Sequence, residues 1–363
     1  MLNQINFLML KLNTSLCFSL IFILSFSWAQ IPEYYSDINF EQQGVSLRLQ
    51  LSNLITETHH TFLPYTSGAT DTWDVMRISD LATENSDSVL LIYGYDDEDD
   101  DFINDRSRDA YDTCHTGWCN GKWNREHVFA RSLSNPVLTT GDPGPGTDIH
   151  NLRAADSQKN TERSNRIFTD ASGNSRTIEG GLYFPGDEWK GDVARIIMYM
   201  YLRYPGQCDA VNSAAGPTTY SLQNDMPDVL LKWNQEDPVS DFELSRNDVI
   251  FSFQGNRNPF IDNPYLANLI WNGPAASNSW GTLSLPIYDE VLVSISPTVT
   301  NRYVTINGLG ESDFKVYIYT SLGQQIANFS RSKTIDLSSF TPGMYILNVV
   351  YPKGASQMKV LVR

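Results

Sequence analysis

Hydrophobic positions recur along this chain with two different periods, and the period changes between regions. Residues 44–58 place apolar side chains at helical spacing, so we predict a helix there, although part of the segment also alternates as a strand would. Residues 192–204 repeat the helical spacing and predict a helix that faces a core. The continuous apolar run at residues 88–95 predicts a buried strand.

Residues 123–168 predict a compact unit made of two strands and a helix. REHVFA (125–130) alternates as a short strand would, and the Gly- and Pro-rich residues 141–146 can reverse the chain. IHNLRAA (149–155) then predicts the returning strand, and Asp156 is a suitable N-cap for the polar helix that follows. This order brings the end of the first strand close to the first turns of the helix.

The last part of the chain has a different pattern. Residues 274–287 are rich in Ser, Gly, Ala and Pro, as a linker would be. Short alternating segments follow at even spacing up to Arg363, and they predict a small β-sandwich over residues 288–363. We therefore expect an α+β domain over residues 30–273, followed by an all-β domain.

Length and the N-terminal pattern agree with two exported domains. The chain has 363 residues, more than one typical domain needs. Residues 1–29 carry Lys11 and then a Leu-, Ile- and Phe-rich run that ends in small residues, which predicts a secretory signal peptide. The run is interrupted and shorter than the roughly 20 residues that span a bilayer, so we expect no stable membrane span in the mature chain.

Three cysteines follow the predicted signal peptide. In an oxidising compartment the CHTGWC pair, Cys114 and Cys119, is close enough in sequence to form a local disulfide. Cys208 would then be unpaired.

Charge argues against a nucleic-acid partner for the chain as a whole, because its formal net charge is -16. Residues 122–166 differ, with seven Lys or Arg against five Asp or Glu. The acidic run DDEDDD (96–101) could suggest calcium, but it lacks the central Gly and closing Glu of an EF-hand loop. We therefore interpret the run as a solvated loop.

Four blocks in the expected order carry a resemblance to a known family: REHV, DIHNLRAAD, NTERSN and GDVARIIMYMYLRY. They resemble the bacterial endonuclease I family of secreted nucleases, and the likeness extends over about residues 47–271. Residues 294–363 resemble the C-terminal sorting domain of type IX secretion substrates. The first resemblance implies a ββα-metal (His-Me finger) active site. It also implies cleavage of DNA, with RNA as an alternative substrate, that leaves 5′-phosphates.

The resemblance implies that Glu126 and Asn160 bind the metal and that His127 is the general base. Phosphodiester hydrolysis needs such a base and a cation, and an amide oxygen suits a hard cation such as Mg²⁺. Glu126 would point to the opposite face of a regular strand, so it joins His127 only where the strand ends or bends. Asp148 and His150 could orient this site or have a purely structural role.

Arginines are the candidates for phosphate contacts, because the guanidinium fork matches phosphate oxygens. They are Arg125, Arg153, Arg163 and Arg166. No motif that reads base edges is present, so we expect contacts with the nucleic-acid backbone and cleavage that is indifferent to sequence. The alternative hypothesis is a noncatalytic surface adhesin, supported by the net charge and the sandwich, but an adhesin does not need the Glu126, His127 and Asn160 set.

Overall fold

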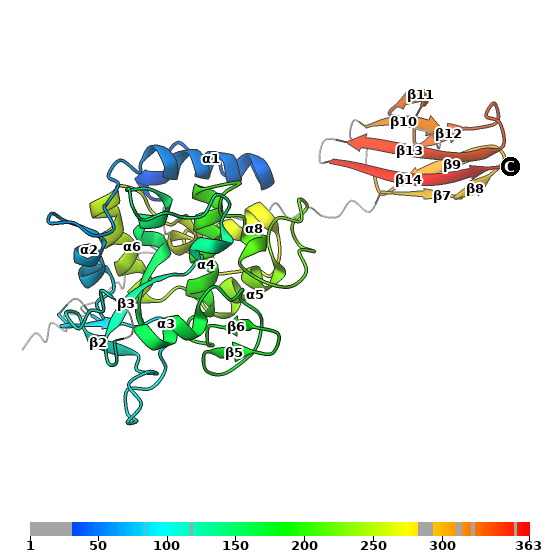
Figure 1. Ribbon diagram of the computed structural model, residues 1–363. Helices are drawn as coiled ribbons and strands as arrows, with labels where there is room; N and C mark the ends of the chain where they lie inside the picture. The colour runs from blue at the N-terminus through cyan, green and yellow to red at the C-terminus, as the bar shows by residue number, and fades with distance from the viewer. Residues whose placement is uncertain are drawn as a thin grey trace, which may run out of the picture. The chain divides into compact units, whose positions relative to one another are not determined.

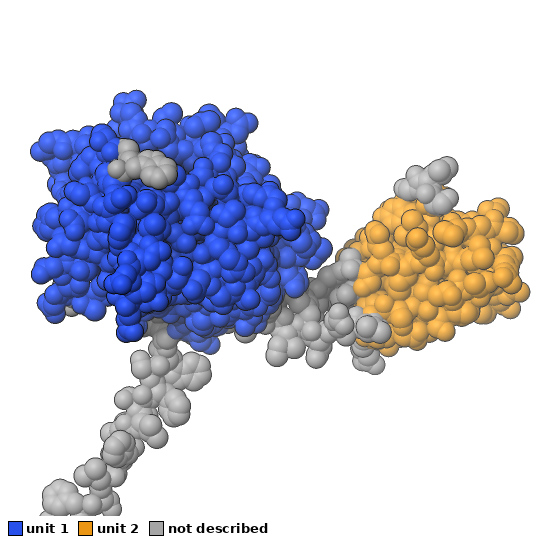
Figure 2. Space-filling view, turned by 60° about the horizontal axis from the view of Figure 1, so that its bottom comes forward, with its two compact units in different colours: residues 1–283 blue, residues 284–363 orange. Residues whose placement is uncertain are grey.

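The computed structural model describes residues 31–83, 85–116, 119–281, 293–309, 314–320, 324–351 and 354–363. The chain divides into two compact units, residues 1–283 and residues 284–363 (Figure 1). Figure 2 colours the two units separately. The predicted signal peptide lies outside the described residues.

The first unit is built around helix α4 (Lys190–Arg203), whose side chains are buried on almost every side. Helix α1 (Gly44–Glu57) packs against α4 and α8 and buries Leu47, Leu51 and Ile55, as the helical spacing predicts. Both predicted helices are therefore confirmed. The other α-helices of the described first unit are α2 (Thr72–Ser79), α3 (Ser157–Arg163), α5 (Asp228–Glu236), α6 (Asp241–Gln254), α7 (Pro259–Asp262) and α8 (Leu266–Trp271).

Strands in the first unit are short and form two-stranded antiparallel pairs. The pairs are β1 (Ser88–Leu90) with β2 (Ser107–Asp109), β3 (Trp123–His127) with β4 (Leu152–Asp156), and β5 (Arg176–Ile178) with β6 (Leu182–Phe184).

The buried strand predicted over residues 88–95 is only three residues long. Leu91, Ile92 and Tyr93 are fully buried but lie outside the strand, and Tyr93 has a positive φ of 75°. An apolar run indicates that a segment is buried, and the structure confirms this for Leu91, Ile92 and Tyr93. Burial alone does not determine whether the backbone forms a strand.

The second unit consists of two mainly antiparallel sheets that share one hydrophobic core. One sheet has the strand order β11-β10-β13-β14-β8 and the other has the order β12-β9-β7. Alternating residues such as Val316, Ile318, Leu347 and Val349 face the core from the larger sheet. The strands are β7 (Ser294–Ser296), β8 (Val299–Thr300), β9 (Tyr303–Asn307), β10 (Lys315–Thr320), β11 (Gln325–Ser330), β12 (Thr334–Asp336), β13 (Gly343–Tyr351) and β14 (Gly354–Val362).

The first half of the predicted linker belongs to the first unit. Ala276 and Trp280 are buried, and the Trp280 ring packs against Tyr35 and Phe40. Small and polar residues suggested a linker, but one tryptophan anchors the segment to the core. Residues 282–292 lie outside the described part of the chain. Among the residues that the structure describes, no helix is both long and apolar enough to cross a bilayer.

Candidate active site

The predicted two strands and helix are present in this order. β3 and β4 pair antiparallel, with His127 opposite Leu152. The Asp156 carboxylate accepts hydrogen bonds from the backbone of Gln158 and Lys159, which confirms it as the N-cap of α3.

The first strand, predicted over residues 125–130, is β3 (Trp123–His127), and two further boundaries in this unit also differ from the prediction. The returning strand begins at Leu152, because Ile149–Asn151 forms a 3-10 helix capped by Asp148. Helix α3 ends at Arg163, since Ser164 has a φ of 53° that leaves the helical region. Both differences follow from local capping that a periodic pattern does not reveal.

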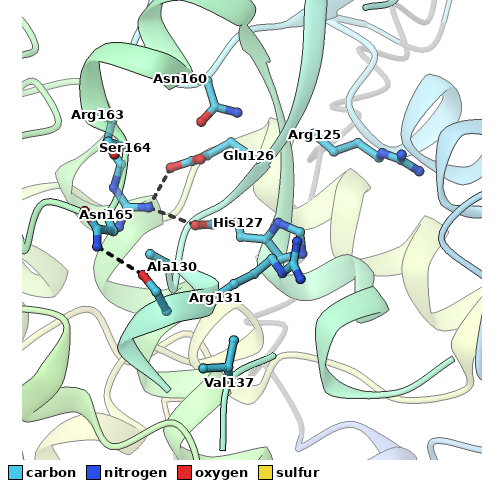
Figure 3. Close-up of a pocket in the computed structure, with 11 residues that line it drawn as sticks. Arg125, Glu126, His127, Ala130, Arg131, Val137, Asn160, Arg163, Ser164 and Asn165 are labelled. Atoms are coloured by element: carbon cyan, nitrogen blue, oxygen red, sulfur yellow. Dashed lines mark hydrogen bonds and ion pairs between the residues drawn. The ribbon is translucent and has the colours of Figure 1, made fainter. Parts of the chain in front are cut away.

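A cavity of about 530 Å³ opens where β3 ends. Its lining contains the three residues proposed for catalysis, because β3 ends at His127 and both Glu126 and His127 reach the opening. Asn160 reaches it from α3 (Figure 3). The lining residues are Arg125, Glu126, His127, Ala130, Arg131, Ser132, Val137, Asn160, Arg163, Ser164 and Asn165.

The His127 imidazole is held in one tautomer. Its Nε2 lies 2.8 Å from the carbonyl oxygen of Gly146, so Nε2 carries the proton and Nδ1 keeps the lone pair. Burial lowers the pKa of His127 to about 4, and nearby arginines add to this effect, so the ring is neutral at ordinary pH. Gly146 cannot be replaced simply, because a Cβ there would lie 2.0 Å from the carbonyl oxygen of Thr139.

Glu126 and Asn160 face each other across the cavity. Glu126 Oε1 accepts from the Tyr93 hydroxyl at 2.9 Å and pairs with Arg163 at 3.0 Å. Burial raises the pKa of Glu126, and Arg163 opposes that shift. Asn160 donates through Nδ2 to Asn124 at 2.8 Å, and its amide oxygen faces the Glu126 carboxylate (Figure 3). The site therefore directs two side-chain oxygens toward one point.

Arg163 lines the cavity but is fully buried and committed to the protein. Its guanidinium donates to the carbonyl oxygens of His127 at 2.9 Å and Val128 at 2.7 Å, in addition to its pair with Glu126. Arg163 thus fixes the end of β3, and this geometry gives it a structural role instead of the phosphate contact predicted from its type.

The other three predicted arginines do not reach the candidate catalytic groups. Arg153 is fully buried and pairs with Asp80 and Asp192, so a phosphate cannot reach it in this structure. Arg166 is half-buried, bonds to the carbonyl oxygens of Glu162 and Arg163 at the end of α3, and is not part of the cavity lining. Arg125 lines the cavity edge, but its side chain points away from Glu126 and His127 (Figure 3).

Arg131, which the sequence did not single out, is exposed and lies beside His127 (Figure 3). Its Nε donates to the carbonyl oxygen of Leu138 at 2.7 Å, which fixes the guanidinium at the cavity. The sequence could have indicated Arg131 through its position four residues after His127. Because β3 ends at His127, the residues that follow lie at the same opening.

Asp148 and His150 belong to a buried network outside the cavity lining. The Asp148 carboxylate accepts from the hydroxyls of Tyr199 at 2.8 Å and Tyr204 at 2.9 Å, and from Gln254 at 3.0 Å. Of the two roles left open by the sequence, the structure supports the structural one.

The acidic run is exposed from Asp97 to Asp101, in agreement with a solvated loop. Within the described ranges, no three His, Cys, Asp or Glu side chains gather as a metal site. The predicted disulfide between Cys114 and Cys119 is present, with the two Cα atoms 5.6 Å apart. Cys208 is a buried free cysteine.

Two known family models match the chain. The family model described as Endonuclease I matches residues 43–265, more than half of the chain. A second model, described as a secretion system C-terminal sorting domain, matches residues 294–363.

Curated relatives are extracellular nucleases. An extracellular ribonuclease of Bacillus amyloliquefaciens is 35% identical over 258 residues, which cover 67% of this chain and 79% of that protein. An extracellular ribonuclease of Bacillus subtilis (strain 168) is 35% identical over 264 residues, covering 69% and 83%. An extracellular deoxyribonuclease of Aeromonas hydrophila is 28% identical over 125 residues, covering 32% and 49%. The chain therefore belongs to the endonuclease I family and is a secreted or cell-surface endonuclease.

Proposed function

We propose that the chain is a metal-dependent endonuclease with a ββα-metal site, and that it hydrolyses phosphodiester bonds without sequence preference. The observation that carries this proposal is the meeting of Glu126, His127 and Asn160 in one cavity, with the His127 lone pair left on Nδ1. A neutral imidazole with one free lone pair is what a general base requires.

His127 Nδ1 removes a proton from the attacking water as the new oxygen–phosphorus bond forms and the bond to the 3′ oxygen breaks. Burial keeps the imidazole neutral before the reaction. The carbonyl oxygen of Gly146 accepts from the opposite ring nitrogen and stabilises the positive charge that the ring gains. The chain itself thus supplies both the base and its orientation.

The oxygen donors fit a hard divalent cation such as Mg²⁺. Two oxygens that face each other, as those of Glu126 and Asn160 do, repel one another unless a cation lies between them. Such a sparse set of protein ligands leaves coordination positions for water and phosphate, as Mg²⁺ sites commonly do. When bound there, Mg²⁺ neutralises the charge that develops on the phosphate and on the leaving oxygen.

Arg131 is the guanidinium that we assign to the phosphate. It is exposed, fixed through Nε, and lies beside the base, so its two terminal nitrogens remain for a bidentate contact. We propose DNA as a substrate and RNA as a second one. The names of the relatives, two ribonucleases and one deoxyribonuclease, support both polymers.

Cleavage of supercoiled plasmid and of a long single-stranded RNA tests the proposal directly. The purified protein should cleave with Mg²⁺ and stop in excess EDTA. His127→Ala should lose about 10²–10⁴ in rate, the range for a positioned acid or base, while its melting temperature shows that it is folded. Undiminished cleavage by the folded variant, or in EDTA, would refute the mechanism.

A further inference from the structure

The His127 imidazole has a flat neighbour that the mechanism above does not use. The Tyr65 ring stacks on it with centroids 5.8 Å apart and an interplanar angle of 26°. Arg125 projects from the same face of β3, two residues before His127, and its Cζ lies 3.3 Å from the centroid of the same Tyr65 ring. The tyrosine ring thus contacts both Arg125 and His127 on this face of the strand.

Arg125 also holds the backbone of Tyr65. Its Nη1 donates to the Tyr65 carbonyl oxygen, and its Nη2 donates to Thr66 Oγ1 at 3.2 Å. Its Cζ lies 4.0 Å from the centroid of Trp73, so the guanidinium contacts two aromatic rings. Arg125, predicted as a phosphate contact, therefore ties the segment that carries Tyr65 to β3.

The same segment is also fixed to helix α2. Thr72 Oγ1 donates to the Tyr65 carbonyl oxygen at 2.9 Å. The N-cap residue Asp71 accepts from the Ser67 backbone at 2.8 Å while it caps α2 in a capping box. Tyr65 thus lies in a segment that is anchored to both β3 and α2, and such a segment can hold a ring against a neighbour.

One hydrogen bond at Nε2 restrains a single atom of the imidazole and leaves the ring free to tilt about it. A stacked ring restrains the plane. We propose that Tyr65 is a positioning residue that fixes the plane of the His127 imidazole, so that Nδ1 is aimed at the attacking water. The inference rests on the proposed role of His127 as the base.

The test compares steady-state kinetics of four variants of the full-length protein on DNA with Mg²⁺. Tyr65→Leu should lower kcat about tenfold with KM changed less than about twofold, because misplacing a catalytic group slows the chemical step without weakening binding. Tyr65→Phe keeps the ring and should restore kcat to within about twofold of the wild type. Phe62→Leu is the matched control, because Phe62 stacks on His59 with centroids 4.4 Å apart in the same connection and does not line the cavity.

His127→Ala completes the series and separates the two ideas. Normal activity of His127→Ala would refute the proposed function itself. An inactive His127→Ala together with a normal kcat of Tyr65→Leu would overturn only the positioning role. A rise in KM alone for Tyr65→Leu would also overturn it and make Tyr65 a substrate contact. If Tyr65→Leu does not fold, Tyr65→Met, which fills similar volume without a ring, gives the same comparison.

Discussion

Replacing Arg163 with methionine separates a structural arginine from a phosphate-binding one. The guanidinium is fully buried, pairs with the buried Glu126, and donates to the carbonyl oxygens of His127 and Val128. Methionine fills similar volume and removes every one of these contacts. The Glu126 carboxylate and both carbonyl groups would then lie in the protein interior without this donor.

The expected loss of stability is large for one substitution. Removing one partner of a buried ion pair costs about 3–5 kcal/mol, because the other charge stays buried and unpaired. The two carbonyl groups belong to the same cluster, so their cost is not simply added. About 4 kcal/mol corresponds to a fall of roughly 10 °C in melting temperature for a unit of this size.

Thermal unfolding and nuclease assays of Arg163→Met should show both effects, a lower melting temperature and lower kcat below that temperature. Arg166→Met is the matched control just past the end of the same helix, since Arg166 is half-buried and bonds to the carbonyl oxygens of Glu162 and Arg163. It should cost less than about 1 kcal/mol. Arg163→Met with an unchanged melting temperature and a tenfold higher KM would refute the reasoning and return Arg163 to the phosphate.

Four further predictions follow from the same structure. Glu126→Ala and Asn160→Ala should each weaken Mg²⁺ binding, measured by calorimetry, and lower activity in parallel; unchanged affinity would exclude them as ligands. Nuclease activity should pass through an optimum at modest salt concentration. Arg131→Met should raise KM and make the decrease of activity above that optimum less steep, without changing the melting temperature. Deleting residues 288–363 should leave nuclease activity nearly unchanged but keep the protein in the periplasm of its native host; an inactive product would contradict separate units. Burial lowers the pKa of His150 to about 3. Between pH 6.5 and pH 3, His150 therefore binds a proton in the unfolded chain but not in the folded one. The free energy of unfolding then falls as the pH falls through that range. The difference in free energy of unfolding between wild type and His150→Gln, measured by urea titration, should therefore narrow by about 1.4 kcal/mol per pH unit below pH 6.5. The same pH dependence of this free energy in both proteins would contradict the reasoning.

Local chemistry explains what the sequence could predict. The spacing of Leu47, Leu51 and Ile55 fixes which face of α1 is apolar, and this face packs inward whatever covers it. Asp156 caps α3 through bonds within its own first turn. The disulfide between Cys114 and Cys119 needed only a short separation in the chain. In each case the interacting groups are neighbours in sequence.

Motif resemblance located the candidate site, because Glu126, His127 and Asn160 lie on a strand and helix that are close in sequence. Glu126 and His127 can line one cavity only where the strand ends, and the structure was needed to show that β3 ends at His127. The tautomer of His127 likewise required the Gly146 carbonyl oxygen, which a loop returns to the strand.

The roles of the arginines were decided by the tertiary structure alone. Arg153 is paired with Asp80 and Asp192, which lie far from it in sequence. Arg125 and Arg163 are likewise held by distant segments, whereas Arg131 remains exposed. An arginine has the same fork in every setting, so sequence determines what it can bind. Long-range partners and burial determine what it does bind, because a phosphate cannot reach a guanidinium that is buried and paired inside the protein.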